Sequence, residues 1–284
     1  MSELPNALTV DVEDYFHVSA LAPHIPRSRW PRMPCRVERN TERILEALEA
    51  RGARATFFVL GWVAERHPVL VRRIVDGGHE LASHGYGHRR VGELGERAFR
   101  EDAVRARELL EQIGGVAVRG YRAPSFSIGA RTPWAHRVLR ETGHRYSSSV
   151  YPVRHDHYGD PEAPRFPHQR EDDGVMELPV TTVRLFGRNW PAAGGGYFRL
   201  LPYAVSRRCL QRVHAADRRP CIFYFHPWEI DPGQPRQPGL PWKTRFRHYL
   251  NLERMEPRLH RLLGDFRWDR LDRVFPGAAG EAAS

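Results

Sequence analysis

Three carboxylates stand together where the first apolar run of the chain ends. Residues 8–14 read Leu-Thr-Val-Asp-Val-Glu-Asp, which places Asp11, Glu13 and Asp14 within four positions. A single carboxylate here could be a turn residue or a helix cap. Like charges this close repel one another unless a cation or a proton lies among them. The three together therefore indicate a cation site.

Two histidines four residues apart follow another apolar run. His84 and His88 lie in Ser-His-Gly-Tyr-Gly-His at 83–88, directly after the run 79–83. If this segment turns helical, both imidazoles lie on one face with Cβ atoms about 5–6 Å apart. One carboxylate and two imidazoles fill three positions of a zinc-like ion and leave the rest open for water and substrate. The spacing therefore favours a catalytic metal site over a closed structural one.

An arginine and a third histidine follow two further apolar runs. Arg122 comes after residues 116–121 and can reach a carboxylate bidentately, although a simple salt bridge at the rim fits equally well. His226 comes after residues 221–225. It could be a hydrogen-bonded structural residue, or an acid that donates a proton near neutral pH.

Short apolar runs alternate with amphipathic segments along the chain. Strands are predicted over seven ranges: 8–12, 55–60, 79–83, 116–121, 146–151, 176–183 and 221–225. Helices are predicted over 38–51, 62–76, 95–113, 131–142 and 203–216. This order predicts an α/β fold with a parallel sheet closed into a (β/α)7 barrel, as a single domain over residues 1–275, with a disordered tail over 276–284. Because active sites of such barrels form at the carboxyl ends of the strands, the four motifs are expected to converge.

Composition excludes several other classes of protein. The formal net charge is +10, but Lys243 is the only lysine and the arginines are spread over nearly every predicted helix, which argues against nucleic-acid binding. No run approaches the ~20 apolar residues of a membrane span, and the N-terminus lacks the pattern of a secretory signal, so we expect a cytoplasmic protein. Three widely spaced cysteines suit neither a disulfide framework nor a zinc site. The oligomeric state is not predicted.

Four motifs in order resemble those of the polysaccharide deacetylase family, also called carbohydrate esterase family four. They are Thr-Val-Asp-Val-Glu-Asp at 9–14, Ser-His-Gly-Tyr-Gly-His at 83–88, Arg-Ala-Pro at 122–124 and His-Pro at 226–227. The branch resembles the deacetylases associated with exosortase and exopolysaccharide loci. The resemblance implies a distorted seven-stranded barrel and a divalent metal, zinc in first place, with cobalt, nickel, iron or manganese also compatible. It also implies an N-acetylated polysaccharide or oligosaccharide as substrate.

The resemblance assigns roles to individual residues. It makes His84 and His88 metal ligands, Asp11 the general base and Arg122 the residue that orients it. The family commonly has two adjacent aspartates where this chain has Asp-Val-Glu-Asp, so the third ligand is Asp14 or Glu13. A turn just past the strand favours Asp14, our first choice. A strand that continues favours Glu13, because alternation then places it on the side of Asp11.

A second departure concerns His226, the expected acid. The family often has an aspartate before the segment that matches 147–152, and here the chain reads Tyr-Ser-Ser-Ser at 146–149. Glu229, Asp231 or Asp156 could orient His226 instead.

The expected reaction is hydrolysis of an N-acetyl group to acetate and a free amine. A backbone N–H near Tyr151 is expected to stabilise the oxyanion. Tyr151 and Trp228 are expected to contact the sugar, although packing at the rim fits them too. The glycine-rich segment 190–199 is either a loop over a sugar ring or a plain connection. Two rival functions remain, another amidohydrolase on the same barrel and a non-catalytic carbohydrate-binding barrel.

Overall fold

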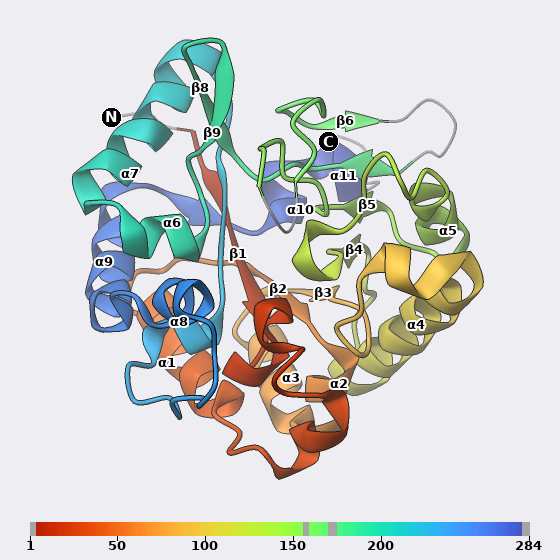
Figure 1. The fold of residues 1–284 in the computed structure, drawn as a ribbon. Helices are drawn as coiled ribbons and strands as arrows, with labels where there is room; N and C mark the ends of the chain where they lie inside the picture. Colours follow the sequence, from red (N-terminus) through yellow and green to blue (C-terminus); the bar gives the residue numbers. More distant parts are fainter. Residues whose placement is uncertain (1–3, 156–158, 170–174, 280–284) are drawn as a thin grey trace.

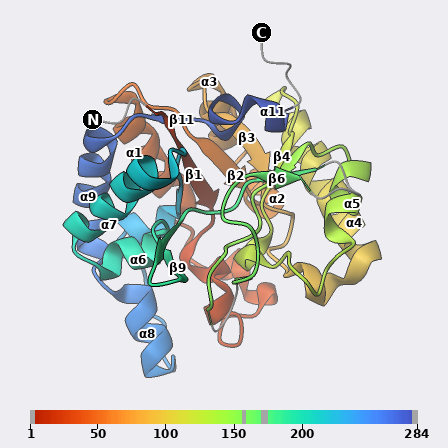
Figure 2. The same cartoon turned by 90° about the horizontal axis from the view of Figure 1, so that it is seen from above.

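A computed structural model describes residues 4–155, 159–169 and 175–279. Parallel strands form a curled sheet in the middle of the molecule, with helices packed around it (Figures 1 and 2). Its hydrogen-bonded order is β10-β1-β2-β3-β4-β5-β7-β6, and β11 also pairs with β1. The strands of this sheet are β1 (Asn6–Val12), β2 (Thr56–Val59), β3 (Glu80–Ser83), β4 (Gly120–Tyr121), β5 (Tyr146–Ser147), β6 (His168–Gln169), β7 (Met176–Glu177), β10 (Ile222–Phe225) and β11 (Trp268–Asp269). Each of the seven predicted ranges contains a strand.

The α/β class and the distorted barrel are confirmed, and the sheet curls into a half-barrel. No strand ladder joins β10 to β7 among the described residues. Instead, the Ile222 N–H donates to Thr181 Oγ1 at 2.7 Å, and the Thr181 N–H donates to the Ile222 carbonyl at 3.3 Å. The predicted strand over 176–183 ends early because Pro179 has no N–H for a ladder. The chain then forms a separate antiparallel hairpin, β8 (Thr182–Leu185) and β9 (Arg188–Pro191), which stands out at the top of Figure 1.

Helices cover the sheet where the amphipathic pattern predicts them. On α1, the side chains of Ile44, Leu45 and Leu48 are buried against the core. Pro68 divides the predicted helix 62–76 in two, and Gly95, at φ +71°, kinks the helix predicted over 95–113. The α-helices are α1 (Val37–Glu49), α2 (Gly61–Arg66), α3 (Pro68–Asp76), α4 (Val91–Gly114), α5 (Ala135–Glu141), α6 (Gly195–Leu200), α7 (Tyr203–Arg212), α8 (Trp242–Tyr249), α9 (Leu252–Asp265), α10 (Leu271–Val274) and α11 (Pro276–Ala279).

Short 3-10 helices shape the loops at the carboxyl edge of the sheet. They are η1 (Tyr15–His17), η2 (Ser19–Leu21), η3 (Arg27–Arg32), η4 (Pro124–Phe126) and η6 (Pro227–Ile230), and a π-helical turn, η5 (Val213–Asp217), extends α7. Among the described residues, no helix combines the length and the apolar character that crossing a membrane requires.

The tail predicted to be disordered over residues 276–284 is helical at its start. Residues 276–279 form α11, and Ala278 is buried in a cluster with Leu271 and Phe275. Apolar packing therefore orders these residues. Residues 280–284 of the predicted tail lie outside the described part of the chain.

Candidate metal centre and active site

Glu13, His84 and His88 form a buried cluster at the carboxyl edge of the sheet. Glu13 Oε1 lies 3.0 Å from Nε2 of His84 and 3.0 Å from Nε2 of His88. One ligand atom from each residue can be chosen so that all three lie within 4.8 Å of one another. Burial by itself raises the pKa of Glu13, but His88 and His84 hold that pKa well below its usual range. Glu13 is therefore a carboxylate that faces two imidazole nitrogens.

The hydrogen bonding of His84 explains why a cation fits here. His84 Nδ1 lies 2.8 Å from the Arg122 carbonyl oxygen, which can only accept, so Nδ1 carries the hydrogen. In the neutral ring, Nε2 then presents a lone pair to the carboxylate of Glu13. Two acceptors 3.0 Å apart are stable only with a positive charge or a proton between them. The donor set fits a divalent metal such as zinc.

A turn, not a helix, brings the two histidines together. After β3 the backbone reverses with Gly85 at φ +72° and His88 at φ +50°. A Cβ at Gly85 would come within 2.8 Å of Asp102 Oδ2, which accepts the Tyr86 N–H at 2.8 Å. Glycine is therefore required at 85 both for the backbone angle and for this approach. The helical spacing considered above does not occur.

The structure corrects Asp14 as the first choice for the third ligand. Its Oδ1 accepts the Tyr15 N–H at 2.8 Å, and its Oδ2 accepts the N–H groups of Arg36 and, at 2.8 Å, Val37. Asp14 is thus the cap of η1 and ties that turn to the start of α1. The alternative, Glu13, lies with the histidines although β1 ends at Val12: its N–H donates to the Asp11 carbonyl at 2.9 Å in a tight turn, and both side chains face His226.

Arg122 and Asp11 lie together as the resemblance implies. Arg122 is fully buried, and its Nη1 donates to Asp11 Oδ1 at 2.7 Å and to Thr9 Oγ1 at 2.7 Å. Its Nε and Nη2 donate to the carbonyl and hydroxyl of Ser148 at 2.9 and 2.8 Å. The contact with Asp11 is therefore single and not bidentate. Asp11 Oδ2 faces His226 Nε2 at 3.9 Å.

Glu229 is the residue that orients His226. Its Oε2 lies 3.3 Å from His226 Nδ1 and accepts the His226 N–H at 3.0 Å, while Arg199 Nε donates to its Oε1 at 3.1 Å. Burial alone lowers the pKa of His226, but Glu229, Glu13 and Asp11 together raise it to about 9. A raised pKa favours the protonated form of His226, which is the form that can donate a proton.

Of the other two candidates for that task, Asp231 makes its described contacts elsewhere. Asp231 pairs with Arg36 and accepts from Asn40 at 3.3 Å. Asp156 lies outside the described residues.

Sequence reasoning missed Arg199, which holds Glu229 in place. Its guanidinium also donates to the carbonyls of His248 and Leu250 at 3.1 and 2.6 Å. These partners lie about fifty residues along the chain, so no local pattern could have revealed them.

The glycine-rich segment 190–199 passes close to the Glu229 carboxylate. A Cβ at Gly195 would lie 1.7 Å from Glu229 Oε2, and one at Gly194, at φ +108°, would lie 2.6 Å from the Tyr224 ring. The glycines thus make room for Glu229 and Tyr224.

Tyr151 and Trp228 pack inside the rim, contrary to their expected contact with sugar. Tyr151 is fully buried and donates its hydroxyl to the Ala193 carbonyl at 2.6 Å. Trp228 is 5% exposed and stacks on His226 and His248, with ring centroids 5.3 and 4.6 Å apart. Aromatic type alone did not reveal this burial.

The serines at 147–149 fill the place of the expected aspartate. Ser147 Oγ donates to Ser149 Oγ at 2.8 Å, and Ser149 Oγ accepts the Ala123 N–H at 2.9 Å. Ser148 holds Arg122, so this segment supports the base side of the site rather than His226.

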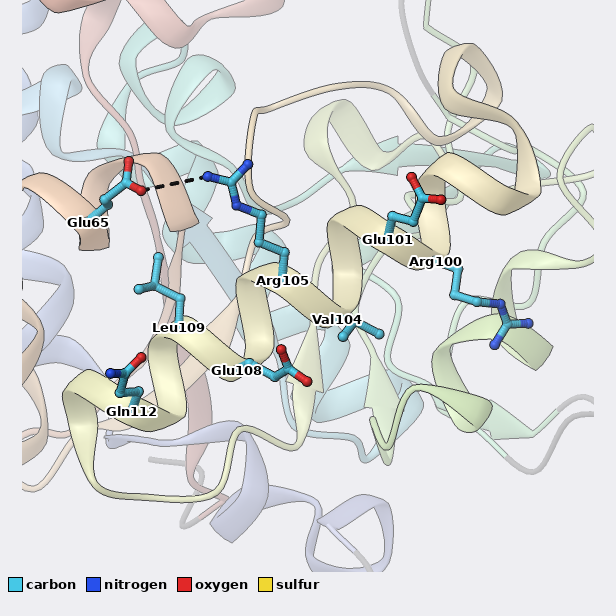
Figure 3. A pocket seen from close by; sticks show the side chains of 8 residues that line it. All are labelled: Glu65, Arg100, Glu101, Val104, Arg105, Glu108, Leu109 and Gln112. Carbon is cyan, nitrogen blue, oxygen red and sulfur yellow. Dashed lines mark ion pairs between the residues drawn. The ribbon is translucent and has the colours of Figure 1, made fainter.

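Two of the hollows in the described part of the chain differ in their relation to the metal cluster. One, of about 430 Å³, has His88 in its wall and opens beside the metal cluster. The other, of about 570 Å³, runs along the outer face of α4, where Arg105 reaches Glu65 of α2 at 3.7 Å (Figure 3). None of the cluster residues lines the groove on α4.

Comparison with known proteins finds two family models that match the chain. Residues 30–147 match the family model "Polysaccharide deacetylase", and residues 148–276 match a domain of unknown function, DUF3473. The first stretch, less than half of the chain, is therefore similar to the polysaccharide deacetylase family. The Asp11–Asp14 motif precedes this polysaccharide deacetylase match, and His226 follows it.

Curated relatives match over part of their length. A peptidoglycan-N-acetylglucosamine deacetylase from Bacillus cereus is 34% identical over 30% of this chain and 30% of its own length. A chitooligosaccharide deacetylase from Sinorhizobium fredii is 35% identical over 39% of this chain and 49% of its own length. The matched stretch thus spans less than half of these relatives.

Solved structures share the fold. A Mycobacterium smegmatis protein assigned as a polysaccharide deacetylase has a TM-score of 0.63 at 21% identity, over 100% of this chain and 94% of its own. A family 4 carbohydrate esterase pseudoenzyme from Bacillus anthracis has a TM-score of 0.50 at 14% identity, over 96% of this chain and 66% of its own. At these identities the likeness concerns the fold alone.

Proposed function

We propose that this protein is a metal-dependent deacetylase that hydrolyses N-acetyl groups on hexosamine units of a polysaccharide. The observation that carries the proposal is the buried cluster of Glu13, His84 and His88 beside Asp11 and His226. These groups supply a metal site, a proton acceptor and a proton donor at one edge of the sheet. We also propose that the protein belongs to the branch of deacetylases associated with exosortase and exopolysaccharide loci.

Glu13, His84 and His88 would hold the divalent ion, with zinc as the first candidate. When bound, the ion would polarise the acetamide carbonyl and lower the pKa of water.

Asp11 takes the proton of the attacking water. The buried guanidinium of Arg122 keeps Asp11 in place through the 2.7 Å bond to Oδ1. This leaves Oδ2, on the side of His226, for the water. A carboxylate held in this way is suited to act as a general base.

His226 protonates the departing amine of the sugar, so that one water and one amide become acetate and an amine. Glu229 fixes the ring by accepting at Nδ1, which directs Nε2 toward Asp11 and Glu13, at 3.9 and 3.8 Å. A backbone N–H near Tyr151 remains the proposed oxyanion donor.

The presence of Glu229 weakens the alternative of a non-catalytic carbohydrate-binding barrel. That alternative rested on the missing acid near Ser147, and Glu229 supplies an acid from another element. A different amidohydrolase on the same barrel would use the same groups on another amide.

The test is metal analysis together with acetate release from N-acetylhexosamine oligomers. We expect the parent protein to carry metal and release acetate, Asp11→Asn to keep the metal with activity lower by about 10²–10⁴-fold, and His84→Ala to lose both. Parent rates in His84→Ala would refute the metal site. Turnover of small cyclic amides without acetate release would favour the other amidohydrolase.

A further inference from the structure

The cavity beside the metal cluster has walls that the proposed chemistry does not use. Besides His88, they come from η1, from η2 and η3 with the loop between them, and from the residues around the start of α4. Its volume of about 430 Å³ lies in the range typical of small-molecule sites, about 300–1,000 Å³. The cavity is therefore large enough for a sugar unit next to the reacting one.

Two buried N–H groups in this wall have no acceptor. His17 Nδ1 accepts the Asp14 N–H at 2.8 Å, so the hydrogen of the neutral ring is on Nε2. His17 Nε2 and Trp30 Nε1 are both buried, and neither has a hydrogen-bond partner among the described residues. The two side chains are only 2% and 4% exposed. A ligand in this cavity that supplies acceptor oxygens could satisfy both donors.

Two arginines line the more exposed part of the same cavity. Arg27 donates through Nε to the Gly87 carbonyl and through Nη2 to the His88 carbonyl, both at 2.8 Å, which fixes its guanidinium beside the histidine turn. Arg90 is half-buried and has no ion pair within the described ranges. Glu93 is the one acid in the lining. Guanidinium groups bind carboxylates well, so this end favours an anion.

We propose that this cavity binds a carboxylate-bearing sugar unit adjacent to the N-acetylated unit at the metal cluster. The sugar carboxylate accepts from His17, Trp30 and the arginines, and Phe16 and Trp30 offer aromatic surface to the ring. The proposal rests on the proposed deacetylase function and adds that the substrate is an acidic polysaccharide with hexuronate next to N-acetylhexosamine.

The first experiment compares acetate release from two oligomers of equal length. One contains only N-acetylglucosamine, and the other alternates N-acetylglucosamine with glucuronate. A charge-assisted hydrogen bond supports an expected preference of about tenfold or more in kcat/KM for the acidic oligomer, mainly through KM and weaker at high salt. Equal kcat/KM for both oligomers would overturn the proposal.

Variants locate the preference in the cavity. Arg90→Gln removes a rim cation, and Trp30→Phe removes a buried N–H but keeps an aromatic ring. Both should reduce the preference for the acidic oligomer by several-fold. Arg89→Gln, an exposed neighbour outside the cavity lining, is the matched control and should leave the preference unchanged. Equal effects of Arg89→Gln and Arg90→Gln would contradict a site in this cavity.

A binding measurement separates this proposal from the deacetylase proposal. Oligoglucuronate carries no acetyl group, so calorimetric titration with it is independent of turnover. Binding that Arg90→Gln weakens and Arg89→Gln does not would support the cavity even if no acetate were released from any oligomer. Acetate release without such binding would leave the deacetylase intact and refute the acidic-sugar site. If Trp30→Phe does not fold, the comparison of Arg90 with Arg89 still decides.

Discussion

Two buried carboxylates on the same sheet face histidine in nearly identical geometry, yet only one of them looks like a reactive centre. Glu177 on β7 lies 2.9 Å from His136 Nε2, and Glu13 lies 3.0 Å from His84 and from His88. At most 3% of either glutamate is exposed. Distance and burial therefore do not distinguish the two sites.

The difference is the balance of donors and acceptors. Glu177 Oε1 accepts the N–H groups of Ser149 and Val150 at 2.8 and 2.9 Å, while Oε2 faces one histidine that can donate. Glu13 Oε1 faces two imidazole nitrogens, and the hydrogen of His84 is already committed to a carbonyl. Donors thus satisfy Glu177, whereas Glu13 has an excess of acceptors that a cation would satisfy.

The two glutamate sites should differ most in their effect on metal content. Glu13→Gln should weaken metal binding by more than about 100-fold, since even partners behind the ligands contribute about 10–100-fold. It should therefore abolish acetate release, whereas Asp14→Asn and Glu177→Gln should keep their metal because their side chains lie elsewhere. Elemental analysis of the purified proteins measures this. Metal loss in Asp14→Asn with retention in Glu13→Gln would reverse the assignment.

Glu177→Gln should have its effect on stability instead. Glu177 is a buried, hydrogen-bonded carboxylate, and leaving its buried donors without that acceptor costs about 1–3 kcal/mol in the free energy of unfolding, which denaturant unfolding measures. Glu96→Gln is the control, because Glu96 pairs with Arg137 at 2.7 Å on the surface and its loss should cost at most about 1 kcal/mol. Similar losses in both variants would mean that the buried contact of Glu177 contributes no more to stability than the surface ion pair of Glu96.

Glu229→Gln should act on the rate of the reaction. Glu229 raises the pKa of His226, so without its charge that pKa is lower and the alkaline limb of kcat moves to lower pH. We expect kcat to fall by about 10–100-fold, part of the 10²–10⁴-fold that a positioned acid contributes. Asp231→Asn, which alters a neighbouring acid bound to Arg36, should leave the limb in place. An unmoved limb in Glu229→Gln would exclude the positioning role.

Some buried histidines have no carboxylate partner, and these should make the stability of the protein depend on pH. Burial lowers the pKa of His79 to about 4 and those of His144 and His248 to about 3. The folded state keeps them neutral while the unfolded state takes up protons below about pH 6.5, so stability is lost as the pH falls from about 6.5 toward 3–4.

Each of these histidines should contribute up to about 1.4 kcal/mol per pH unit in that window. Glu80 acts in the opposite direction, because burial raises its pKa to about 7 and favours its protonated form as the pH falls from 7 toward 4.5. Unfolding of His144→Asn between pH 7 and 5 should show a shallower pH dependence than the parent. An unchanged slope would contradict a neutral buried His144.

Local pattern was enough to predict the strands and the residues at their ends. The apolar runs before Asp11, His84, Arg122 and His226 located these residues, and the parallel order brought them together. The choice between Asp14 and Glu13 depended on how the backbone turns after Val12, which the sequence Asp-Val-Glu-Asp does not reveal. Two of the backbone N–H groups that donate to Asp14 belong to residues 36 and 37, which lie far from it along the chain.

Burial and long-range contacts set the limit of prediction. Tyr151 and Trp228 have the chemistry of sugar platforms, but the hairpin and helix packing that covers them is tertiary. Glu229 was one of three candidates for orienting His226. The sequence does not reveal that Arg199 pairs with Glu229 whereas Arg36 pairs with Asp231. The hydrogen bonds between Thr181 and Ile222, across the open side of the half-barrel, likewise involve no strand pattern.

The bonds from Arg122 to Ser148 cross the boundary at 147/148 between the two matched families. A chain cleaved at that boundary would leave the proposed base and metal ligands on one fragment and the proposed acid, His226, on the other. Complementation of separately expressed fragments would therefore report assembly directly, since turnover could return only when a guanidinium from one piece finds its serine on the other.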